Sequence, residues 1–317
     1  MSLVGSMVGR YRVLRLLGEG GMARVFLAED TTVGRHVAIK ALLPEYSQHA
    51  TILERFMNEA RAMGRIQHPG VVDVFDVTMG PGGELCIIME LLGGATLREH
   101  LWKHGPFAIA EALPVMHQLA DTLAAAHAQR VVHRDLKPEN VFVIPDPLGP
   151  RIKVLDFGIA KVLDAQNVKT ATTAQMGTAT YMAPEQFRSA KLVDHRADIY
   201  AVGCLFFELL TGKPPFGGRN LFEQMSAHLG QPIPLERLPP ELPAHVRDLI
   251  GRMLVKDRDQ RIGSMSEVTA ALGGAAPAPS PPPAAVAAAA PRDRSWIWAL
   301  LAILVVGVGV ALTIALT

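Results

Sequence analysis

Six polar or charged side chains crowd into the ten-residue stretch "VVHRDLKPEN", which has apolar segments on both sides. They are His133, Arg134, Asp135, Lys137, Glu139 and Asn140. A solvated turn between two apolar elements is the default interpretation of such a cluster. The alternative is a reaction centre held between two core elements. The other motifs of the chain decide between these two interpretations.

Another side chain with acceptor oxygens, that of Asp156, follows this cluster along the chain. The apolar stretch "IKVLDFGIA" predicts a strand that delivers Asp156 to a turn, 16 residues after Asn140. Either residue alone is more often a turn former. Together they offer hard oxygen ligands that suit Mg²⁺, which binds few protein groups and completes its shell with water and phosphate.

Lys40 ends the apolar run "VAIK", where the default is an exposed lysine at a strand end. The next stretch predicts a helix over about residues 50–66, and Glu59 falls on the same helical face as Phe56 and Met63. A carboxylate on a core-facing stripe is costly unless something pairs with it. We therefore predict a Lys40–Glu59 ion pair that holds the lysine toward a phosphate group.

Residues 11–40 predict three strands joined by turns, and the first turn holds Gly18, Gly20 and Gly21. A hairpin turn explains these glycines, so the signal is weak alone. A dinucleotide-binding motif is disfavoured, because that motif must open a helix whereas "RVFLAED" is extended. The glycines permit close approach of the backbone to a bulky anion.

The middle of the chain changes from strand to helix. The run "LCIIMELLGG" predicts a strand that ends in a glycine hinge between two lobes. Beyond residue 110 the pattern is mainly helical, because apolar residues recur at three- and four-residue steps. These residues include Leu113, Met116, Leu119 and Leu123.

The bulk composition excludes several classes of protein. Apolar residues make up 49 % of the 317 positions, which supplies a sizeable core. The formal charge of +1 gives no reason to expect a nucleic-acid partner. Cys86 and Cys204 lie in apolar runs and predict buried free thiols, as in a reducing compartment. The eleven histidines show no metal-ligand spacing.

The C-terminal region predicts a linker and a membrane anchor. Residues 273–295 are rich in Pro and Ala, and residues 296–316 carry no charge. As a helix this last stretch would span roughly 30 Å, the thickness of a bilayer core. The alternative, a buried soluble helix, lacks further chain to bury it. Arg292 and Arg294 before it predict a single-pass protein of the cell (inner) membrane with residues 1–295 in the cytoplasm.

One face of this predicted membrane helix carries small residues. Gly307, Ala311 and Ala315 recur at four-residue steps, and such stripes let two helices approach closely. A homodimer is therefore one interpretation of the stripe. The other is that small residues are simply common in membrane helices.

Seven motifs occur in one order between about residues 11 and 270. They are "LGEGGMARV", "VAIK", "HRDLKPEN", "DFG", "GTATYMAPE", "DIYAVG" and the arginine of "KDRDQR". In this the sequence resembles the protein kinase catalytic domain, and specifically the membrane-anchored eukaryotic-like Ser/Thr kinases of bacteria. The resemblance implies transfer of the ATP γ-phosphate to serine and threonine hydroxyls of proteins, with autophosphorylation of the activation loop.

The resemblance also implies an α+β fold of two lobes, the first small and β-rich and the second larger and mainly helical. The expected parts are an N-terminal extension, a kinase domain, the linker and one transmembrane helix. Their ranges are 1–10, 11–272 (lobes 11–90 and 91–272), 273–295 and 296–316.

The resemblance implies a function for each position that matches one of the family's motifs. Asp135 accepts the substrate's hydroxyl proton, Lys137 contacts the γ-phosphate, and Lys40, oriented by Glu59, holds the α- and β-phosphates. Asn140 and Asp156 hold Mg²⁺. The expected ATP contacts are Leu17, Gly18, Glu19, Gly20, Gly21, Met22, Ala23, Arg24, Val25, Ala38, Lys40, Glu59, Met89, Glu90 and Leu92. Ala23 replaces the family's third glycine, a departure that bacterial members share.

Further positions are expected to regulate or brace the domain. Thr178 matches a threonine that seats the substrate hydroxyl, and Asp198 and the Glu185–Arg261 pair match structural anchors. The expected phosphorylation sites are Thr170, Thr172 and Thr173. In related kinases the arginine at position 134 pairs with such a phosphate.

Three rival functions share part of this evidence. A pseudokinase that binds ATP or acts as a scaffold would normally lack Lys40, Asp135 or Asp156, and all three are present. A small-molecule phosphotransferase can share the loop "HRDLKPEN" but is not expected to have "GTATYMAPE". A membrane interaction protein would only recruit partners.

Overall fold

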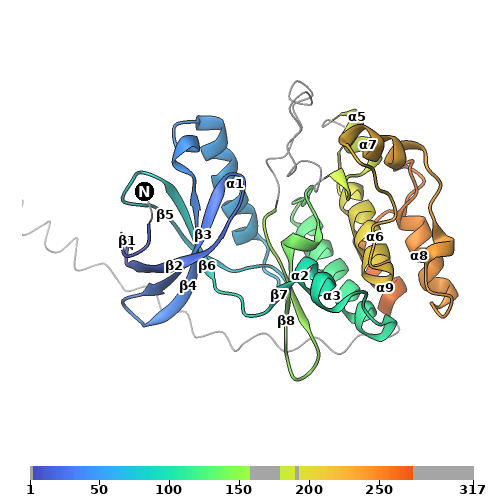
Figure 1. Cartoon of the computed structure of the whole chain (residues 1–317), viewed down its shortest axis with the longest axis horizontal. Coiled ribbons are helices and arrows are strands. Elements are labelled where there is room, and N and C mark those ends of the chain that lie inside the picture. The colour runs from blue at the N-terminus through green and yellow to red at the C-terminus, as the bar shows by residue number, and fades with distance from the viewer. Residues whose placement is uncertain (1–2, 158–178, 190–192, 274–317) are drawn as a thin grey trace, which may run out of the picture. The chain divides into compact units, whose positions relative to one another are not determined.

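Strand-forming residues of the first ninety positions build a six-stranded antiparallel sheet in the order β1-β2-β3-β4-β6-β5, within the described chain. The computed structural model describes residues 3–157, 179–189 and 193–273 (Figure 1). The strands are β1 (Met7–Val8), β2 (Tyr11–Glu19), β3 (Ala23–Asp30), β4 (Arg35–Leu42), β5 (Val74–Met79) and β6 (Leu85–Glu90). The N-terminal segment thus adds a strand, β1, to the sheet.

Two details of this sheet differ from the sequence prediction. Lys40 lies inside β4, two residues before its end, because the strand continues through Ala41 and Leu42. Gly18 and Glu19 belong to β2, where they pair with Val25 and Arg24 of β3. The turn between β2 and β3 is therefore shorter than the glycine pattern indicated.

The two faces of the sheet bury different partners. One face packs Phe26, Ile39 and Ile88 with Val8 of β1. The other face packs Leu42 and Ile87 against helix α1 (Ala50–Arg65), through Phe56 and Ala60. The predicted helix over residues 50–66 is confirmed. It brings the helical face that carries Glu59 toward β4.

A second, three-stranded sheet begins directly after the opening motif, whose last residue, Asn140, precedes β8. Its strands are β7 (Ala95–Thr96), β8 (Val141–Ile144) and β9 (Arg151–Val154), in that order. The segment from Val131 to Asn140 connects α3 (Ile109–Ala128) to β8 and ends in a short 3₁₀ turn, Pro138–Asn140. The polar cluster is therefore held between a core helix and a core strand.

The two sheets are joined by hydrogen bonds next to β9. Val154 N donates to Gly70 O at 2.7 Å, and Val72 N donates to Val154 O at 3.2 Å. Lys153 Nζ donates to Val71 O at 2.9 Å and to the carboxylate of Glu90. These bonds attach the segments that leave α1 and β6 to the second sheet.

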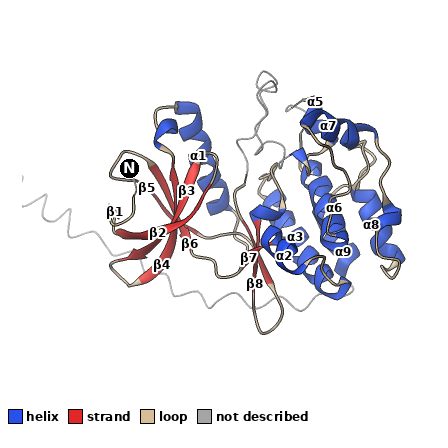
Figure 2. Ribbon diagram, viewed as in Figure 1, coloured by secondary structure: helices blue, strands red, loops and turns tan. Residues whose placement is uncertain are grey.

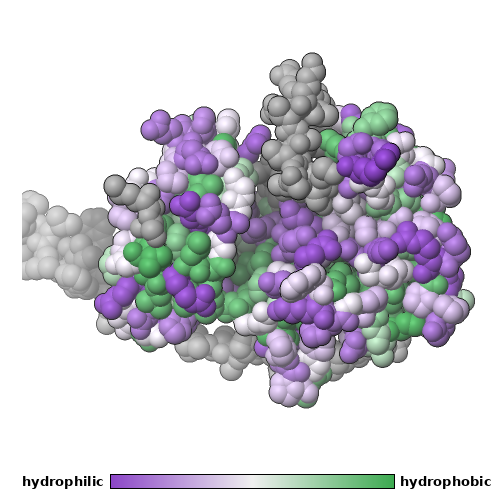
Figure 3. Space-filling view, in the orientation of Figure 1, coloured by the Kyte–Doolittle hydropathy of each residue, from purple (hydrophilic) through white to green (hydrophobic). Residues whose placement is uncertain are grey.

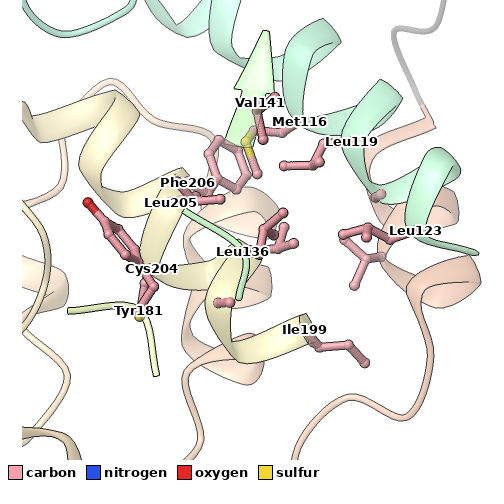
Figure 4. Close-up of a cluster of buried hydrophobic side chains, with 14 of the residues drawn as sticks. Met116, Leu119, Leu123, Leu136, Val141, Tyr181, Ile199, Cys204, Leu205 and Phe206 are labelled. Atoms are coloured by element: carbon pink, nitrogen blue, oxygen red, sulfur yellow. The ribbon is translucent and has the colours of Figure 1, made fainter. Parts of the chain in front are cut away.

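The rest of the described chain is mainly helical (Figure 2). Its helices are α2 (Leu97–His104), α3, α5 (Pro184–Arg188), α6 (Arg196–Thr211), α7 (Leu221–Gly230), α8 (Ala244–Met253) and α9 (Met265–Leu272). Every residue of α6 from Ala197 to Leu210 is buried. Figure 4 shows part of this core, where Met116 of α3 lies beside Phe206 of α6. The predicted α+β organisation is confirmed.

Several predictions lie outside the described residues. These are the phosphorylation sites Thr170, Thr172 and Thr173, the substrate-seating Thr178, and the segment 296–316. Of the helices in the described ranges, none has the length and apolar character needed to cross a membrane.

Candidate active site

Lys40 lies between two carboxylates. Its position in β4 pairs it with Val25 of β3 and Ile87 of β6. Its Nζ lies 2.6 Å from Glu59 Oε1 and 2.7 Å from Asp156 Oδ1. The predicted Lys40–Glu59 pair is confirmed. The contact with Asp156 joins strand, helix and the turn after β9 through one ammonium group.

The charges of this triad depend on one another. Burial acts to lower the pKa of Lys40, but the carboxylates of Asp156 and Glu59 outweigh it and raise that pKa, so Lys40 stays an ammonium. Burial, followed by the charge of Asp156, raises the pKa of Glu59 to about 7. Burial also acts to raise the pKa of Asp156, but Lys40 outweighs it and lowers that pKa. Asp156 is therefore the firmly ionised carboxylate.

Asp135 is oriented by the loop that carries it. Lys137 Nζ lies 3.3 Å from Asp135 Oδ2, and Asn140 Nδ2 donates to Asp135 O at 2.8 Å. Asp135 N donates to His133 Nδ1 at 3.3 Å, while His133 Nε2 lies 2.9 Å from Leu155 O. Since Leu155 O can only accept, this pattern fits a neutral His133 protonated at Nε2. The histidine thus links the loop of Asp135 to the residue before Asp156.

Asp198 of α6 binds the backbone of the same loop through its carboxylate. Its carboxylate accepts hydrogen bonds from His133 N and Arg134 N, each at 2.8 Å, and lies 2.8 Å from His127 Nε2. Arg134 has φ 64°, a conformation that non-glycine residues seldom adopt. These bonds stabilise that conformation. Asp198 thus has the contacts expected of a structural anchor.

The second predicted anchor is a buried ion pair. Arg261 donates to both oxygens of Glu185, at 2.8 and 3.0 Å. It also donates to Arg196 O at 2.6 Å. The Glu185–Arg261 pair predicted by the family resemblance is therefore present. It attaches α5 to the segments around α6 and α8.

Asn140 and Asp156 have the chemistry needed to hold a divalent cation. Asn140 uses its amide nitrogen to bind Asp135 O, which leaves the amide oxygen as the acceptor of that side chain. Asp156 is 42 % exposed, so its carboxylate is accessible to a ligand. Among the described residues there is no group of three or more His, Cys, Asp or Glu side chains that could hold a metal ion alone. A pair of oxygen donors fits Mg²⁺, which takes its other ligands from phosphate and water.

The predicted ATP contacts lie on β2, β3, β4 and β6, in the turn between β2 and β3, just beyond β6 and, for Glu59, on α1. Leu17 and Met22 are partly exposed, at 39 % and 44 %, near the turn between β2 and β3. Ala38 and Met89 are direct neighbours across β4 and β6, and both are buried. The N–H of Glu90 donates to Asp73 O at 2.9 Å. The Glu90 side chain accepts from Asp73 N and Lys153, a function that the sequence did not predict.

Three further residues that brace the site were missed. They are His127, bound to Asp198, Gln186, whose Nε2 donates to Arg134 O, and Lys153. Each contacts a residue that is far away in the sequence, and no local pattern reports such a contact. For His127 only a weak signal existed: a histidine in the last turn of a helix that precedes the polar loop.

Comparisons with known proteins agree with this geometry. The family model described as "Protein kinase domain" matches residues 11–271. Serine/threonine-protein kinase pkn2 of Myxococcus xanthus is 41 % identical over 275 residues, which cover 84 % of this chain and 32 % of that protein. Serine/threonine-protein kinase PrkC of Bacillus subtilis is 38 % identical, with 84 % and 41 % covered. For PknA of Mycobacterium tuberculosis the values are 38 %, 83 % and 61 %.

The chain thus spans between about a third and three fifths of the length of these curated relatives. The matched region contains the whole described site, from the strand of Lys40 to Arg261. This chain belongs to the protein kinase family, in its bacterial branch of eukaryotic-like Ser/Thr kinases.

Proposed function

We propose that this protein is a Ser/Thr protein kinase that transfers the ATP γ-phosphate to hydroxyl groups of protein substrates with Mg²⁺ as cofactor. The observation that carries the proposal is the assembled triad of Lys40, Glu59 and Asp156, together with Asp135 beside Lys137. A pseudokinase would have no need of this complete set. The names of the relatives support Ser/Thr as the acceptor class.

Each side chain has a task that follows from its charge and position. Bound ATP and Mg²⁺ supply the phosphoryl donor and neutralise its charge. Lys40 binds the phosphates, and the two carboxylates beside it fix its direction. Asp135 orients the substrate hydroxyl and accepts its proton, while Lys137 offsets negative charge at the transferred group. Positioning and electrostatics carry most of such a transfer.

The decisive experiment replaces Asp135 in the full-length protein. Asp135→Asn keeps the size of the side chain but removes the charge that accepts the proton, so ATP binding should survive while turnover falls by orders of magnitude. The measurement is Mg²⁺-dependent transfer of labelled phosphate to the protein itself and to a generic basic protein, with ATP affinity measured separately. Transfer at the wild-type rate by Asp135→Asn would overturn the mechanism.

Lys40→Met is the matched variant in the small lobe. It should abolish transfer and weaken ATP binding as well, because the phosphates lose their cation. A small-molecule phosphotransferase would leave both protein acceptors unlabelled in the wild type. A membrane interaction protein without catalysis would show no Mg²⁺-dependent transfer at all.

Activation by phosphorylation of Thr170 or Thr172, with Thr173 next, is part of the proposal. Arg134 supports it, because its Nε is buried and has no hydrogen-bond partner among the described residues. A phosphate would supply acceptor oxygens to this guanidinium. Mass spectrometry of active enzyme should find these threonines modified, and the double variant Thr170→Ala, Thr172→Ala should lose activity. Full activity of that variant contradicts the idea.

The proposal also places the kinase domain at the cytoplasmic face of the cell (inner) membrane, with residues 296–316 as a single-pass anchor. The uncharged stretch and the preceding arginines Arg292 and Arg294 support it. The stripe of Gly307, Ala311 and Ala315 supports a homodimer. The double variant Gly307→Leu, Ala311→Leu should then show less membrane crosslinking and less autophosphorylation at low enzyme density. If both stay unchanged, the segment acts as an anchor only.

A further inference from the structure

Lys256 places an ammonium group among aromatic side chains of the large lobe. Its Nζ lies 3.3 Å from the centre of the Phe216 ring and 5.7 Å from the centre of the Tyr200 ring. It also donates to Tyr200 Oη at 3.3 Å and to Ala227 O at 3.5 Å. These contacts take the place of the water that surrounds an exposed lysine. The catalytic contacts described above do not involve this lysine.

The hydrogen bonds that start at Lys256 have one direction. An ammonium group only donates, so Tyr200 Oη accepts from it and donates its own proton elsewhere. That proton goes to His228 Nδ1, which lies 2.9 Å away. Burial raises the pKa of Tyr200 and lowers that of His228 to about 3, so the hydroxyl is protonated and the imidazole is neutral. His228 therefore carries its single proton on Nε2.

Helix α7 turns two side chains toward Thr180. Gln224 Nε2 donates to Thr180 Oγ1 at 3.3 Å, and His228 lies one turn later on the same face of the helix. Against burial, which dominates, the backbone of Thr180 acts to raise the pKa of His228, the effect of a carbonyl acceptor near the ring. His228 is fully buried, and its Nε2 has no hydrogen-bond partner within the described part of the chain. Because Tyr200 occupies Nδ1, the Nε2–H group is the one left for that carbonyl.

The segment around Thr180 lies next to the catalytic loop. Thr180 directly precedes Tyr181, and Tyr181 and Met182 line one small cavity together with Asp135. Thr180 also follows by two residues Thr178, the predicted seat of the substrate hydroxyl. A change in the position of Thr180 therefore acts on the acceptor side of the site. The predicted ATP contacts lie in the small lobe and just beyond it.

We propose that Lys256 is a positioning residue for the protein substrate, which acts through Tyr200 and His228 on residues 179–182. The charged lysine fixes the tautomer in which His228 presents a donor to the carbonyl of Thr180. A neutral amine can also accept from Tyr200, whose oxygen can then accept from the Nδ1–H group of His228, so both tautomers become available. In the second tautomer Nε2 is an acceptor beside a carbonyl, and the attraction is lost. The proposal rests on the proposed kinase function.

The groups around Lys256 set the pH at which the lysine changes its charge. Burial lowers the pKa of Lys256 to about 8, while Cys204 of α6 acts to raise it and Arg261 acts to lower it. Burial raises the pKa of the Cys204 thiol, so this thiol stays neutral, as do Tyr200 and His228. Within this described cluster, the charge that changes between pH 7 and 9 is therefore that of Lys256.

The test measures phosphate transfer by the full-length protein to a generic basic protein, with KM determined separately for that acceptor and for ATP. At pH 7, Lys256→Met should raise the acceptor KM about threefold or more, the value of one hydrogen bond, and should leave the ATP KM within about twofold. Tyr200→Phe keeps the ring but interrupts the series of bonds and should give the same increase. The double variant should be no worse than either single variant. Lys213→Met removes an exposed lysine of the large lobe and should change neither KM.

A pH profile separates positioning from a purely structural function. The ratio of acceptor KM between Lys256→Met and wild type should fall toward one at pH 9, because the wild-type lysine has then lost its charge. Effects of pH on the acceptor itself cancel in this ratio. The pKa of Lys256 lies below its usual value near 10.5, so burial of the charged lysine costs stability below pH 8, and this cost fades as the pH rises from 8 to 10.5. Lys256→Met should therefore not lower the urea midpoint at pH 7.

Nitrogen NMR of the full-length protein with labelled histidines measures the tautomer without any activity. His228, assigned by the signal missing from His228→Asn, should carry its proton on Nε2 at pH 7 and should populate both tautomers at pH 9 and in Tyr200→Phe. A single Nε2–H tautomer at pH 9 overturns the proposal, as does an unchanged acceptor KM in Lys256→Met at pH 7.

The remaining outcomes also decide the question. A lower urea midpoint of Lys256→Met, with kcat reduced and both KM values unchanged, assigns a structural function to Lys256 and overturns the proposal. If Lys256→Met does not fold, Tyr200→Phe takes its place, and an acceptor KM equal to that of wild type overturns the proposal. Absence of transfer by wild type overturns the proposed kinase function instead, and a pH-dependent tautomer of His228 then still supports the series of bonds from Lys256.

Discussion

The described large lobe buries more charged side chains than the described small lobe does. In the described small lobe the buried residues are mostly apolar, and some large apolar side chains are exposed, among them Leu14, Leu16 and Met22. Figure 3 shows hydrophobic surface on this lobe. In the described large lobe, charged groups such as Asp198 and Glu208 lie in the core. The large lobe therefore uses buried charge to fix a backbone. The small lobe uses an apolar sheet to present one lysine.

This difference follows from what each lobe must hold. The loop of Asp135 has no regular structure of its own over most of its length, so its N–H groups need acceptors, which Asp198 supplies. Lys40 lies in a regular strand whose ladder already satisfies the backbone. Only its ammonium group needs partners. Rigidity thus comes from side-chain acceptors in one lobe and from strand pairing in the other.

The largest effect should come from removing one member of a buried pair in the large lobe. Arg261→Met leaves Glu185 without its cation, and the free energy of unfolding should fall by about 3 to 5 kcal/mol. Urea denaturation of the full-length protein measures this loss. The matched control is Arg219→Met, which removes an exposed i,i+4 partner of Glu223 and should leave the midpoint unchanged. Equal losses of unfolding free energy in both variants would contradict the claim that the buried pair stabilises the large lobe more than the exposed pair does.

A leucine in each lobe provides the second test. Leu205 in α6 is fully buried, so Leu205→Ala should lower the free energy of unfolding by about 2 to 5 kcal/mol. Leu16 in β2 is 43 % exposed, and Leu16→Ala should stay within about 0.5 kcal/mol of wild type. The same urea titrations apply, with unchanged slopes expected. A loss of more than about 2 kcal/mol for Leu16→Ala would show that the small-lobe surface contributes to stability as a core does.

The smallest expected effect is a pH dependence of the triad of Lys40, Glu59 and Asp156. Glu59, with a pKa of about 7, loses its charge as the pH falls, so it then binds Lys40 less well. Between pH 7.5 and 6.5 the ionised fraction of such a group drops about threefold, and kcat/KM for ATP should drop with it. In Glu59→Gln this step should disappear and the remaining activity should be low. A step of equal size in both proteins would assign it to another group.

The sign of the effect on stability is opposite. The pKa of Glu59 in the folded protein is higher than in the unfolded chain, so its contribution to stability is fully present below the unfolded value near 4.5. That contribution is lost as the pH rises through about 7. The difference in unfolding free energy between wild type and Glu59→Gln should therefore shrink from pH 5 to pH 8, while activity rises.

Much of the site could be predicted because its residues lie in short, characteristic motifs. The pair of Lys40 and Glu59 followed from one periodicity argument, since a carboxylate on a buried helix face needs a cation. Asp156 lies after β9, as its predicted position after an extended segment required, whereas Asn140 lies in the 3₁₀ turn before β8 and not after a strand. These predictions needed only local pattern and the cost of burying charge.

Other features depended on contacts between distant segments and could not be predicted. The bond of Lys40 to Asp156 spans 116 positions, and that of Arg98 to Glu208 spans 110. The place of Lys40 within β4 was missed because Ala41 and Leu42 gain their strand conformation from pairing with β3. These contacts and the end of β4 depend on pairing between distant segments and not on the local propensity of the residues.

The bonds around β9 determine which motions between the two sheets cost little free energy. Gly70, Val71 and Glu90 are all attached to Val154 or Lys153, close to where the chain passes from one sheet to the other. Sliding one sheet over the other would break all of these bonds at once. A rotation whose axis passes through this attachment leaves their lengths nearly unchanged. We therefore expect rotation about that axis to cost less free energy than sliding, with a displacement that grows with distance from β9.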